Sequence, residues 1–335
     1  MATTTRNLLL TGAGFTHNFG APLARDLWNK IYNDKAVRNH PTLIDLLHAK
    51  EPDFETVYQE VVDGDYPDDA KAAIQLAVNG AFSCIDQNLL FPSSLPDSPS
   101  VQHVTDLVKE FRPRHPDQRA YFFTLNQDLF VERHMLENAE LHPLGIGRRP
   151  GFSGQYLGQR PLTRDELKAL PDEAALPAVR KNAEAHCRFG YVKLHGSQDW
   201  LDSSGRGAMV LGRAKEEMIA GEPILKWYLD LFRAVLTDSA HRLVVIGYSF
   251  RDVHINRALA AAINGPGLDL VVISPTPNGS FEAGLTEQEC GQEIRLALRR
   301  RGSRYYEWRL KDVFPAGTWC SPGAEWGDLK ALLRS

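Results

Sequence analysis

Five short apolar segments, each ending in small or polar residues, constrain the fold of this chain most strongly. They cover residues 7–11, 121–124, 191–194, 242–246 and 268–273. Most are rich in β-branched or aromatic side chains, which is typical of strands buried on both faces of a parallel sheet. The stretches between them show helical spacing and are long enough to be crossovers. This alternation predicts an α/β fold, a doubly wound, Rossmann-like parallel sheet with helices on both faces.

Two further elements are predicted near the carboxyl terminus. Residues 305–310 predict a sixth strand. Residues 326–333 predict a closing helix, because apolar positions recur there at spacings of three and four.

Two long segments interrupt the alternation and are too long to be simple loops. Residues 26–114 read as an inserted helical module, and residues 140–187 as a smaller insertion that is helical around 164–169. The main domain would then comprise residues 1–25 and 115–335. The apolar faces expected in the helical module contain Leu43, Leu46 and Leu47 in one stretch and Ala73, Leu76 and Ala77 in another.

Composition narrows the class of protein. With 335 residues, of which 43% are hydrophobic and 24% charged, the chain can bury a large core. Its net charge of -4 lacks the basic excess of a dedicated nucleic-acid binder, so we expect no direct nucleic-acid binding by this chain alone. The short basic runs 148–149 and 299–301 are interpreted as solvated faces, with contact to nucleic acid or an acidic partner as the alternative.

The cysteines and the apolar runs bear on metal content and localisation. Cys84, Cys187, Cys290 and Cys320 form no CxxC pair, so we expect neither a zinc site nor a disulfide framework. The apolar stretch near the amino terminus is too short for a signal peptide, and no run of about 18 apolar residues predicts a membrane span. A cytoplasmic protein fits these observations.

Glycine and polar residues directly after the first two predicted strands carry the first chemical signals. Gly12, Ala13 and Gly14 follow residues 7–11, and backbone amides there could approach a pyrophosphate. A tight structural turn is the alternative. Asn126 and Asp128 follow the second strand, where Asn126 could hold a ribose hydroxyl or a water. Either residue could instead cap the next helix.

The later strands end in a similar way. His195 ends the strand at 191–194, and its imidazole could act as a base or orient a ribose hydroxyl, although a lone histidine is more often structural. Gly247 and Ser249 follow the next strand, and Asp252 and Asn256 enter a helix, for which Asp252 could be the cap. Ser274, after the strand at 268–273, is a plausible neighbour of an adenine ribose.

Four motifs in order resemble the sirtuin family, and more closely its bacterial sirtuin-like branch found in antiviral defence. They are GAGFT at 12–16, TLNQD at 124–128, LHGS at 194–197 and GYSF at 247–250. The resemblance covers strand ends across about residues 6–276, whereas the two insertions carry no recognisable motif. The paired CxxC motifs of a sirtuin zinc module are absent from the sequence, which disfavours protein deacylation.

The resemblance implies roles for the strand-end residues. The implied catalytic residues are Asn126, Asp128 and His195. The implied NAD-binding residues are Gly12, Ala13, Gly14, Phe15, Thr16, Thr124, Gly247, Ser249, Asn256 and Ser274. NAD would be the substrate and not a recycled carrier.

We therefore expect an NAD hydrolase that produces nicotinamide and ADP-ribose in antiphage defence, with no zinc. An uncontrolled enzyme would deplete its own cell, so control by homo-oligomerisation or by a partner is expected. The resemblance suggests a HerA-like ATPase or an Argonaute-like protein as that partner. It would be encoded separately, because this chain contains no GxxxxGK[ST] phosphate loop. An NAD-dependent protein deacylase and a non-catalytic NAD or ADP-ribose sensor are the alternatives.

Overall fold

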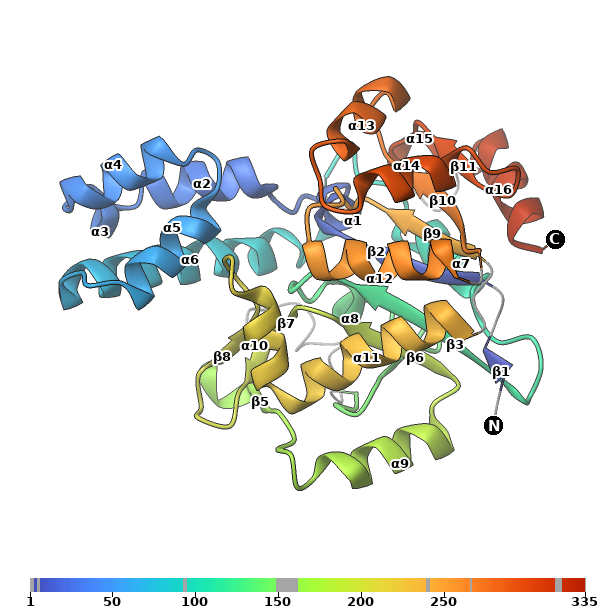
Figure 1. The fold of residues 1–335 in the computed structure, drawn as a ribbon, viewed down its shortest axis with the longest axis horizontal. Coiled ribbons are helices and arrows are strands. Elements are labelled where there is room, and N and C mark those ends of the chain that lie inside the picture. The colour runs from blue at the N-terminus through green and yellow to red at the C-terminus, as the bar shows by residue number, and fades with distance from the viewer. Residues whose placement is uncertain are drawn as a thin grey trace.

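A parallel β-sheet forms the centre of the computed structural model, which describes residues 3–4, 7–92, 95–148, 162–238, 242–265, 267–316 and 321–334 (Figure 1). Every pair of neighbouring strands in this sheet is parallel. In sheet order the strands are β11 (Arg304–Tyr306), β10 (Asp269–Ile273), β9 (Arg242–Ile246), β2 (Asn7–Thr11), β3 (Gln118–Thr124), β6 (Phe189–Lys193) and β4 (His142–Pro143), with β1 (Thr3–Thr4) paired to β3.

The strand order places a topological switch point between β2 and β9. From β2 the chain adds β3 and then β6 on one side, and from β9 it adds β10 and β11 on the other. This is the order of a Rossmann-like doubly wound sheet, in which ligands bind outside the carboxyl ends of the strands at the switch point. The α/β class and the parallel sheet are confirmed. We call the two ends of the strands the carboxyl edge and the amino edge of the sheet.

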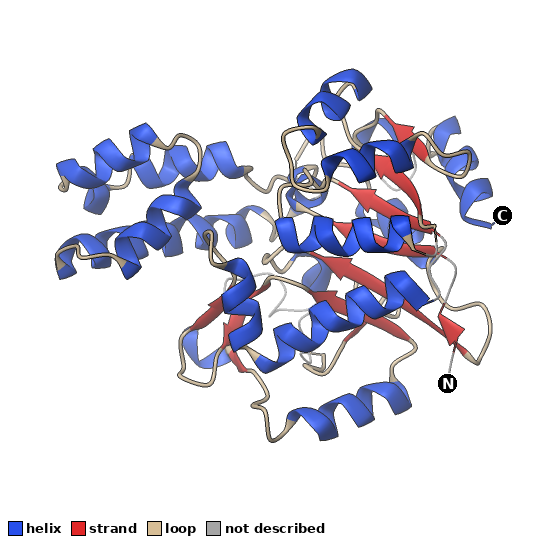
Figure 2. Cartoon of the chain, viewed as in Figure 1, coloured by secondary structure: helices blue, strands red, loops and turns tan. Residues whose placement is uncertain are grey.

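Helices cover both faces of the sheet (Figure 2). On β2, Leu9 points into one apolar cluster, and Leu8 and Leu10 point into the other. The Leu9 side is covered by α1 (Ala13–His17), α7 (Val101–Lys109), α8 (Phe130–His134), α15 (Leu310–Val313) and α16 (Ala324–Arg334). The other side is covered by α9 (Leu176–His186), α10 (Lys215–Gly221), α11 (Pro223–Asp238), α12 (Val253–Asn264), α13 (Asn278–Leu285) and α14 (Gly291–Leu298).

Five helices between β2 and β3 pack against one another beside the carboxyl edge, at the left of Figure 1. They are α2 (Ala24–Tyr32), α3 (Lys35–Arg38), α4 (Pro41–Ala49), α5 (Phe54–Asp63) and α6 (Asp68–Asn88). Their buried apolar side chains belong to the same cluster as Leu9. Leu43, Leu47, Ala73 and Ala77 are buried as predicted. Leu76 is 63% exposed, so its predicted place on the buried face of α6 is wrong.

A second, small sheet corrects the prediction for residues 164–169. Only Arg164–Glu166 are helical, as a short 3-10 helix, and the rest of the segment is extended in β5 (Lys168–Ala169). β5 pairs with β7 (Gly196–Leu201), which in turn pairs with β8 (Gly207–Met209). Pairing with β7 therefore decides the local structure. Residues 149–161 of the predicted smaller insertion lie outside the described residues, as does Arg149.

The carboxyl-terminal predictions are confirmed in part. The sixth strand is β11, but it ends at Tyr306 and not at Leu310. Leu310 instead begins α15, where the Arg309 amide donates to the Asp312 carboxylate at 3.0 Å. The closing helix is α16 and spans the predicted residues.

Three of the cysteines, Cys84, Cys187 and Cys290, are free thiols, and Cys320 lies outside the described residues. Among the helices of the described ranges, none has both the length and the apolar character needed to cross a bilayer.

Candidate functional site

The glycine turns after β2 and β9 contact each other directly at the switch point. The Gly12 amide donates to the Ile246 carbonyl at 3.0 Å, and the Gly14 amide donates to the Gly247 carbonyl at 2.9 Å. Gly247 has φ +66°, and a Cβ there would lie 2.3 Å from the Phe15 nitrogen. Close backbone packing thus accounts for these glycines, as the structural-turn alternative predicts. A role of the Gly12 and Gly14 amides toward a pyrophosphate stays a prediction.

Thr16, Asn126 and Asp128 form a buried hydrogen-bonded group between the ends of β2 and β3. The Thr16 hydroxyl donates to Asp128 Oδ2 at 2.9 Å, and Asn126 Nδ2 donates to Thr16 Oγ1 at 3.1 Å. Asp128 Oδ1 accepts from the Phe130 amide at 3.0 Å and so satisfies the first amide of α8, as the capping alternative expects, although Leu129 stands at the N-cap position. The structure therefore brings three predicted site residues together.

Thr124 and Phe15 stabilise the backbone around this group. Thr124 Oγ1 accepts from the Thr11 hydroxyl at 2.8 Å and from the Asn126 amide at 3.1 Å. Phe15 is buried and packs edge-on against Phe122 and Phe130. Ala13, between the two glycines, is exposed.

Lys193 supplies a buried positive charge beside Asp128. Its ammonium donates to the Asp128 backbone carbonyl and lies 2.8 Å from the Glu132 carboxylate. Burial raises the pKa of the Asp128 carboxyl above its ordinary value, and the charge of Lys193 opposes this shift. Lys193 is not among the predicted site residues, although a single lysine within a strand buried on both faces is a visible signal.

A second buried pair joins this region to the helices at 24–88. Arg133 of α8 and Asp86 of α6 make two contacts, Nε to Oδ1 at 2.9 Å and Nη2 to Oδ2 at 2.7 Å. Both side chains are almost fully buried. The pair fixes α6 against the helix that follows the Asp128 turn.

His195 lies at the carboxyl end of β6 and faces a second histidine. Its Nε2 is 2.9 Å from Nε2 of His254, the second residue of α12, and both side chains are buried. One ring donates and the other accepts, so the two cannot both be protonated on these nitrogens. Burial lowers the pKa of His195 from 6.5 to about 3 and also lowers the pKa of His254. His254, within the VHIN segment, is not among the predicted site residues.

Asp252 faces the histidine pair, and it is held by Lys215. Burial alone would raise the pKa of Asp252, but the positive charge of Lys215 and its hydrogen bond hold that pKa below its ordinary value. Asp252 stands at the N-cap position of α12 but makes no side-chain cap bond there, contrary to the capping alternative. The Lys215 ammonium is 2.9 Å from Asp252 and 3.0 Å from Glu55 of α5. Lys215 thus connects Glu55, in the helices at 24–88, to Asp252 beside the histidine pair.

Gln127 connects the Asn126 turn to the His195 turn. Its side-chain amide donates to the backbone carbonyls of His195 at 3.2 Å and Val210 at 2.8 Å. The ends of β3 and β6 are therefore fixed relative to each other by a residue that the sequence analysis did not single out.

The remaining predicted residues lie around β9 and β10. Asn256 is fully buried, and it donates to the Phe250 carbonyl at 2.7 Å and accepts from the Tyr248 hydroxyl at 3.2 Å. Its side chain is thus occupied within the turn after β9. Ser249 is exposed beside Gly247. Ser274 directly follows β10, and its hydroxyl accepts from the Thr276 amide at 3.2 Å.

The site offers a neutral imidazole pair and an amide–hydroxyl–carboxylate group at one edge of the sheet. Such groups can bind hydroxyl-rich ligands and take up a proton. Within the described ranges, no three His, Cys, Asp or Glu side chains are grouped so that they could hold a metal ion. No protein-family model matches the sequence, and no curated protein is significantly similar to it.

Proposed function

We propose that this chain binds NAD and hydrolyses its N-glycosidic bond to give nicotinamide and ADP-ribose. The observation that carries the proposal is the convergence of Thr16, Asn126, Asp128 and His195 at the carboxyl edge beside the switch point. This is where doubly wound sheets bind nucleotides. The resemblance of the four motifs to sirtuin-like proteins supports NAD as the ligand, and the missing cysteine pairs favour water over an acyl group as the nucleophile.

In the proposed reaction, NAD lies across the carboxyl edge with its pyrophosphate near residues 12–16. Asn126 positions a water molecule, since its Nδ2 is used by Thr16 and its Oδ1 can accept a hydrogen bond from the water. The bond between ribose C1′ and the nicotinamide nitrogen breaks, and the water oxygen bonds to C1′. His195, neutral because it is buried, either polarises a ribose hydroxyl or accepts the proton lost by the water, and this proton then passes to solvent.

The finer structural and biological assignments belong to the same proposal. We infer a sirtuin-type domain made of residues 1–25 and 115–335, a helical module inserted at 26–114 and a smaller insertion at 140–187. The protein would act in the cytoplasm in antiphage defence, with its activity controlled by homo-oligomerisation or by a HerA-like or Argonaute-like partner. The contact of Lys215 with both Glu55 and Asp252 supports a link between the helices and the site.

The test is an NAD consumption assay on purified protein, with and without candidate partners, that measures released nicotinamide. Asn126→Ala and His195→Ala should each lower turnover by about 10² to 10⁴, the usual effect of removing a water-positioning group or a base. His48→Ala and Asn182→Ala are matched controls on exposed helix positions and should keep the parent's rate.

Three outcomes would contradict parts of the proposal. Parent-like turnover in both site variants would disprove the site assignment. Tight NAD binding without nicotinamide release would indicate a sensor. Release of nicotinamide only in the presence of an acyl-lysine peptide would indicate a deacylase.

A further inference from the structure

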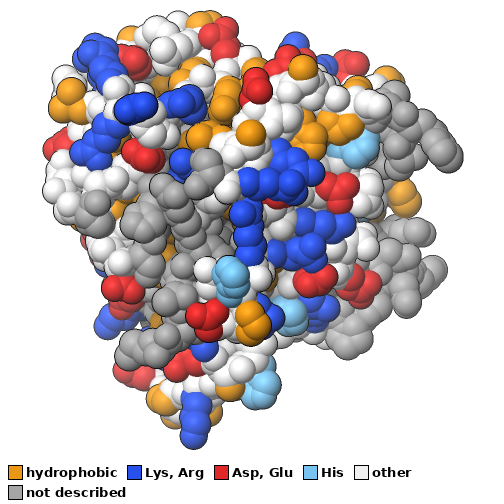
Figure 3. Space-filling model, turned by 90° about the vertical axis from the view of Figure 1, so that its right-hand side faces the viewer, with side chains coloured by type: hydrophobic (Ala, Val, Ile, Leu, Met, Phe, Trp, Pro, Cys, Tyr) orange, Lys and Arg blue, Asp and Glu red, His pale blue; other side chains and the backbone are white. Residues whose placement is uncertain are grey.

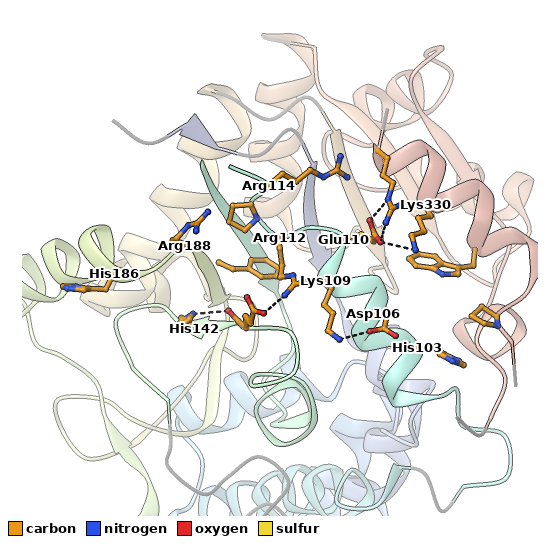
Figure 4. A pocket seen from close by; sticks show the side chains of 16 residues that line it. His103, Asp106, Lys109, Glu110, Arg112, Arg114, His142, His186, Arg188 and Lys330 are labelled. Carbon is orange, nitrogen blue, oxygen red and sulfur yellow. Dashed lines mark hydrogen bonds and ion pairs between the residues drawn. The ribbon is translucent and has the colours of Figure 1, made fainter. Parts of the chain in front are cut away.

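The amino edge of the sheet carries a cavity that the proposed function does not use. Its volume is about 750 Å³, and its walls come from α7, from the loops that precede β3 and β6, and from α16 (Figure 4). Arg188 and Phe189 line it at the start of β6, whereas His195 follows the end of the same strand. The cavity and the candidate site therefore lie at opposite edges of one sheet.

The cavity is strongly positive. Three carboxylates line it, Asp106, Glu110 and Glu140. The cationic side chains that line it are Lys109, Arg112, Arg114, Arg188, Lys330 and Arg334. They exceed the carboxylates by three charges in a chain whose net charge is -4. Figure 3 looks onto this edge and shows lysine and arginine side chains gathered near its centre.

The three carboxylates are already paired. Asp106 lies 2.8 Å from Lys109, and Glu140 lies 2.6 Å from Arg112. Glu110 accepts from Arg334 at 2.7 Å and has Lys330 3.5 Å away. These pairs fix the walls, because they join α7 to α16 and the loop after α7 to Glu140 (Figure 4).

Arg114 and Arg188 are different, since no carboxylate within the described ranges pairs with either. Arg114 Nη2 donates to the Leu333 carbonyl at 3.4 Å, and Arg188 Nη2 donates to the His115 carbonyl at 2.7 Å. Each contact uses one donor of a guanidinium that carries five. The cavity thus presents two arginine forks whose remaining donors face solvent.

We infer that this cavity binds a small ligand that carries two or more phosphate groups. Its volume lies within the range of small-molecule sites, about 300–1,000 Å³. Guanidinium forks match phosphate oxygens in a bidentate geometry, and the charge excess suits a polyanion. A nucleic acid is disfavoured, because the excess is confined to one cavity of an acidic chain, whereas a nucleic-acid track neutralises many successive phosphates.

The experiment measures binding to the full chain by calorimetry at a fixed salt concentration near 0.1 M. The probes are inorganic tripolyphosphate, ATP without metal, and a single-stranded oligonucleotide. Arg114→Ala and Arg188→Ala should each weaken tripolyphosphate and ATP binding about tenfold or more, because each removes charged hydrogen bonds. Arg301→Ala removes one exposed arginine elsewhere and should leave both affinities unchanged. Thermal melting checks that the variants are folded.

Several results would overturn the inference. They are absence of tripolyphosphate and ATP binding by the parent, equal weakening by Arg301→Ala, or an oligonucleotide affinity above that of both phosphate probes. Asn126→Ala separates this inference from the proposed function, because it should lower NAD turnover by about 10² to 10⁴ and leave tripolyphosphate binding unchanged. Either proposal can therefore fail without the other.

Discussion

The carboxyl and amino edges of this sheet carry polar residues in two different environments. At the carboxyl edge, His195, Asp128 and Lys193 are buried, and backbone turns pack directly on one another. At the amino edge, charged side chains such as Arg114 and Arg188 are exposed around an open cavity. Burial sets the properties of the first group, and water screens the second. The same change of charge should therefore alter the free energy of unfolding much more at the carboxyl edge than at the amino edge.

The largest expected difference concerns ion pairs. Arg133→Met leaves Asp86 buried without its partner and should lower the free energy of unfolding by about 3–5 kcal/mol. Arg334→Met breaks the pair with Glu110 at the amino edge, where the arginine side chain is 54% exposed, and should lower the free energy of unfolding far less because water screens an exposed pair. Urea denaturation of both variants measures the difference. Equal losses of unfolding free energy in the two variants would contradict the proposed difference between the two edges.

Backbone packing gives the next largest effect. Gly247→Ala adds a left-handed residue and a clash with the Phe15 nitrogen, so we expect a loss of about 2–4 kcal/mol in unfolding free energy. Gly205→Ala is the control, because Gly205 has φ +77° but nothing near its Cβ position. This variant should lower the free energy of unfolding by only about 1–2 kcal/mol, the cost of a left-handed backbone conformation in a residue that carries a Cβ. Thermal and urea unfolding report both values, and a Gly205 variant as unstable as the Gly247 variant would contradict the clash.

The buried histidines predict a pH dependence. The folded state keeps His195 neutral down to about pH 3, whereas the unfolded chain protonates it near 6.5. Stability is therefore fully present above pH 6.5 and falls on acidification toward pH 3, by up to about 1.4 kcal/mol per pH unit for this group. His195→Gln should flatten the pH profile of unfolding free energy, and His48→Gln should not. An unchanged slope in the first variant would show that His195 is not the group responsible.

The smallest effect on stability is expected for Glu140→Gln at the amino edge. The pair with Arg112 is exposed, so the free energy of unfolding should change by less than about 1 kcal/mol. Removing the negative charge makes the cavity more positive, and tripolyphosphate binding should tighten by about two- to threefold. Calorimetry and urea denaturation check the two expectations. Weaker binding would oppose the charge argument.

Much of the architecture follows from sequence pattern. The strands near residues 7–11 and 242–246 are apolar runs of the right length, and both are confirmed within a parallel sheet. The contact between Thr16 and Asn126 could also be predicted from the sequence, because residues that follow parallel strands lie at the same edge of the sheet. The structure of the short charged segment 164–169 could not be predicted from the sequence, since it depends on pairing with β7 and not on the segment's own preference.

The partners within the site could not be read from the sequence. His254 and Lys215 are ordinary helix residues until α12 and α10 pack near His195 and Asp252. Asn256 looked like a ligand-facing residue, yet its side chain is used by the turn after β9. For His254 and Lys215 a contact between segments distant in sequence decides the role, and a local pattern carries no information about such contacts.

The pairing of β2 with β9 has a consequence for biosynthesis. The two strands lie side by side, although Asn7 and Arg242 are 235 residues apart in the chain. At about 5–20 residues per second, a ribosome needs roughly 10–50 s to make β9 after β2. Throughout that interval the side of β2 that pairs with β9 stays open, so the two halves of the sheet can join only late. A chaperone that shields apolar strands during translation would therefore raise the yield of folded protein.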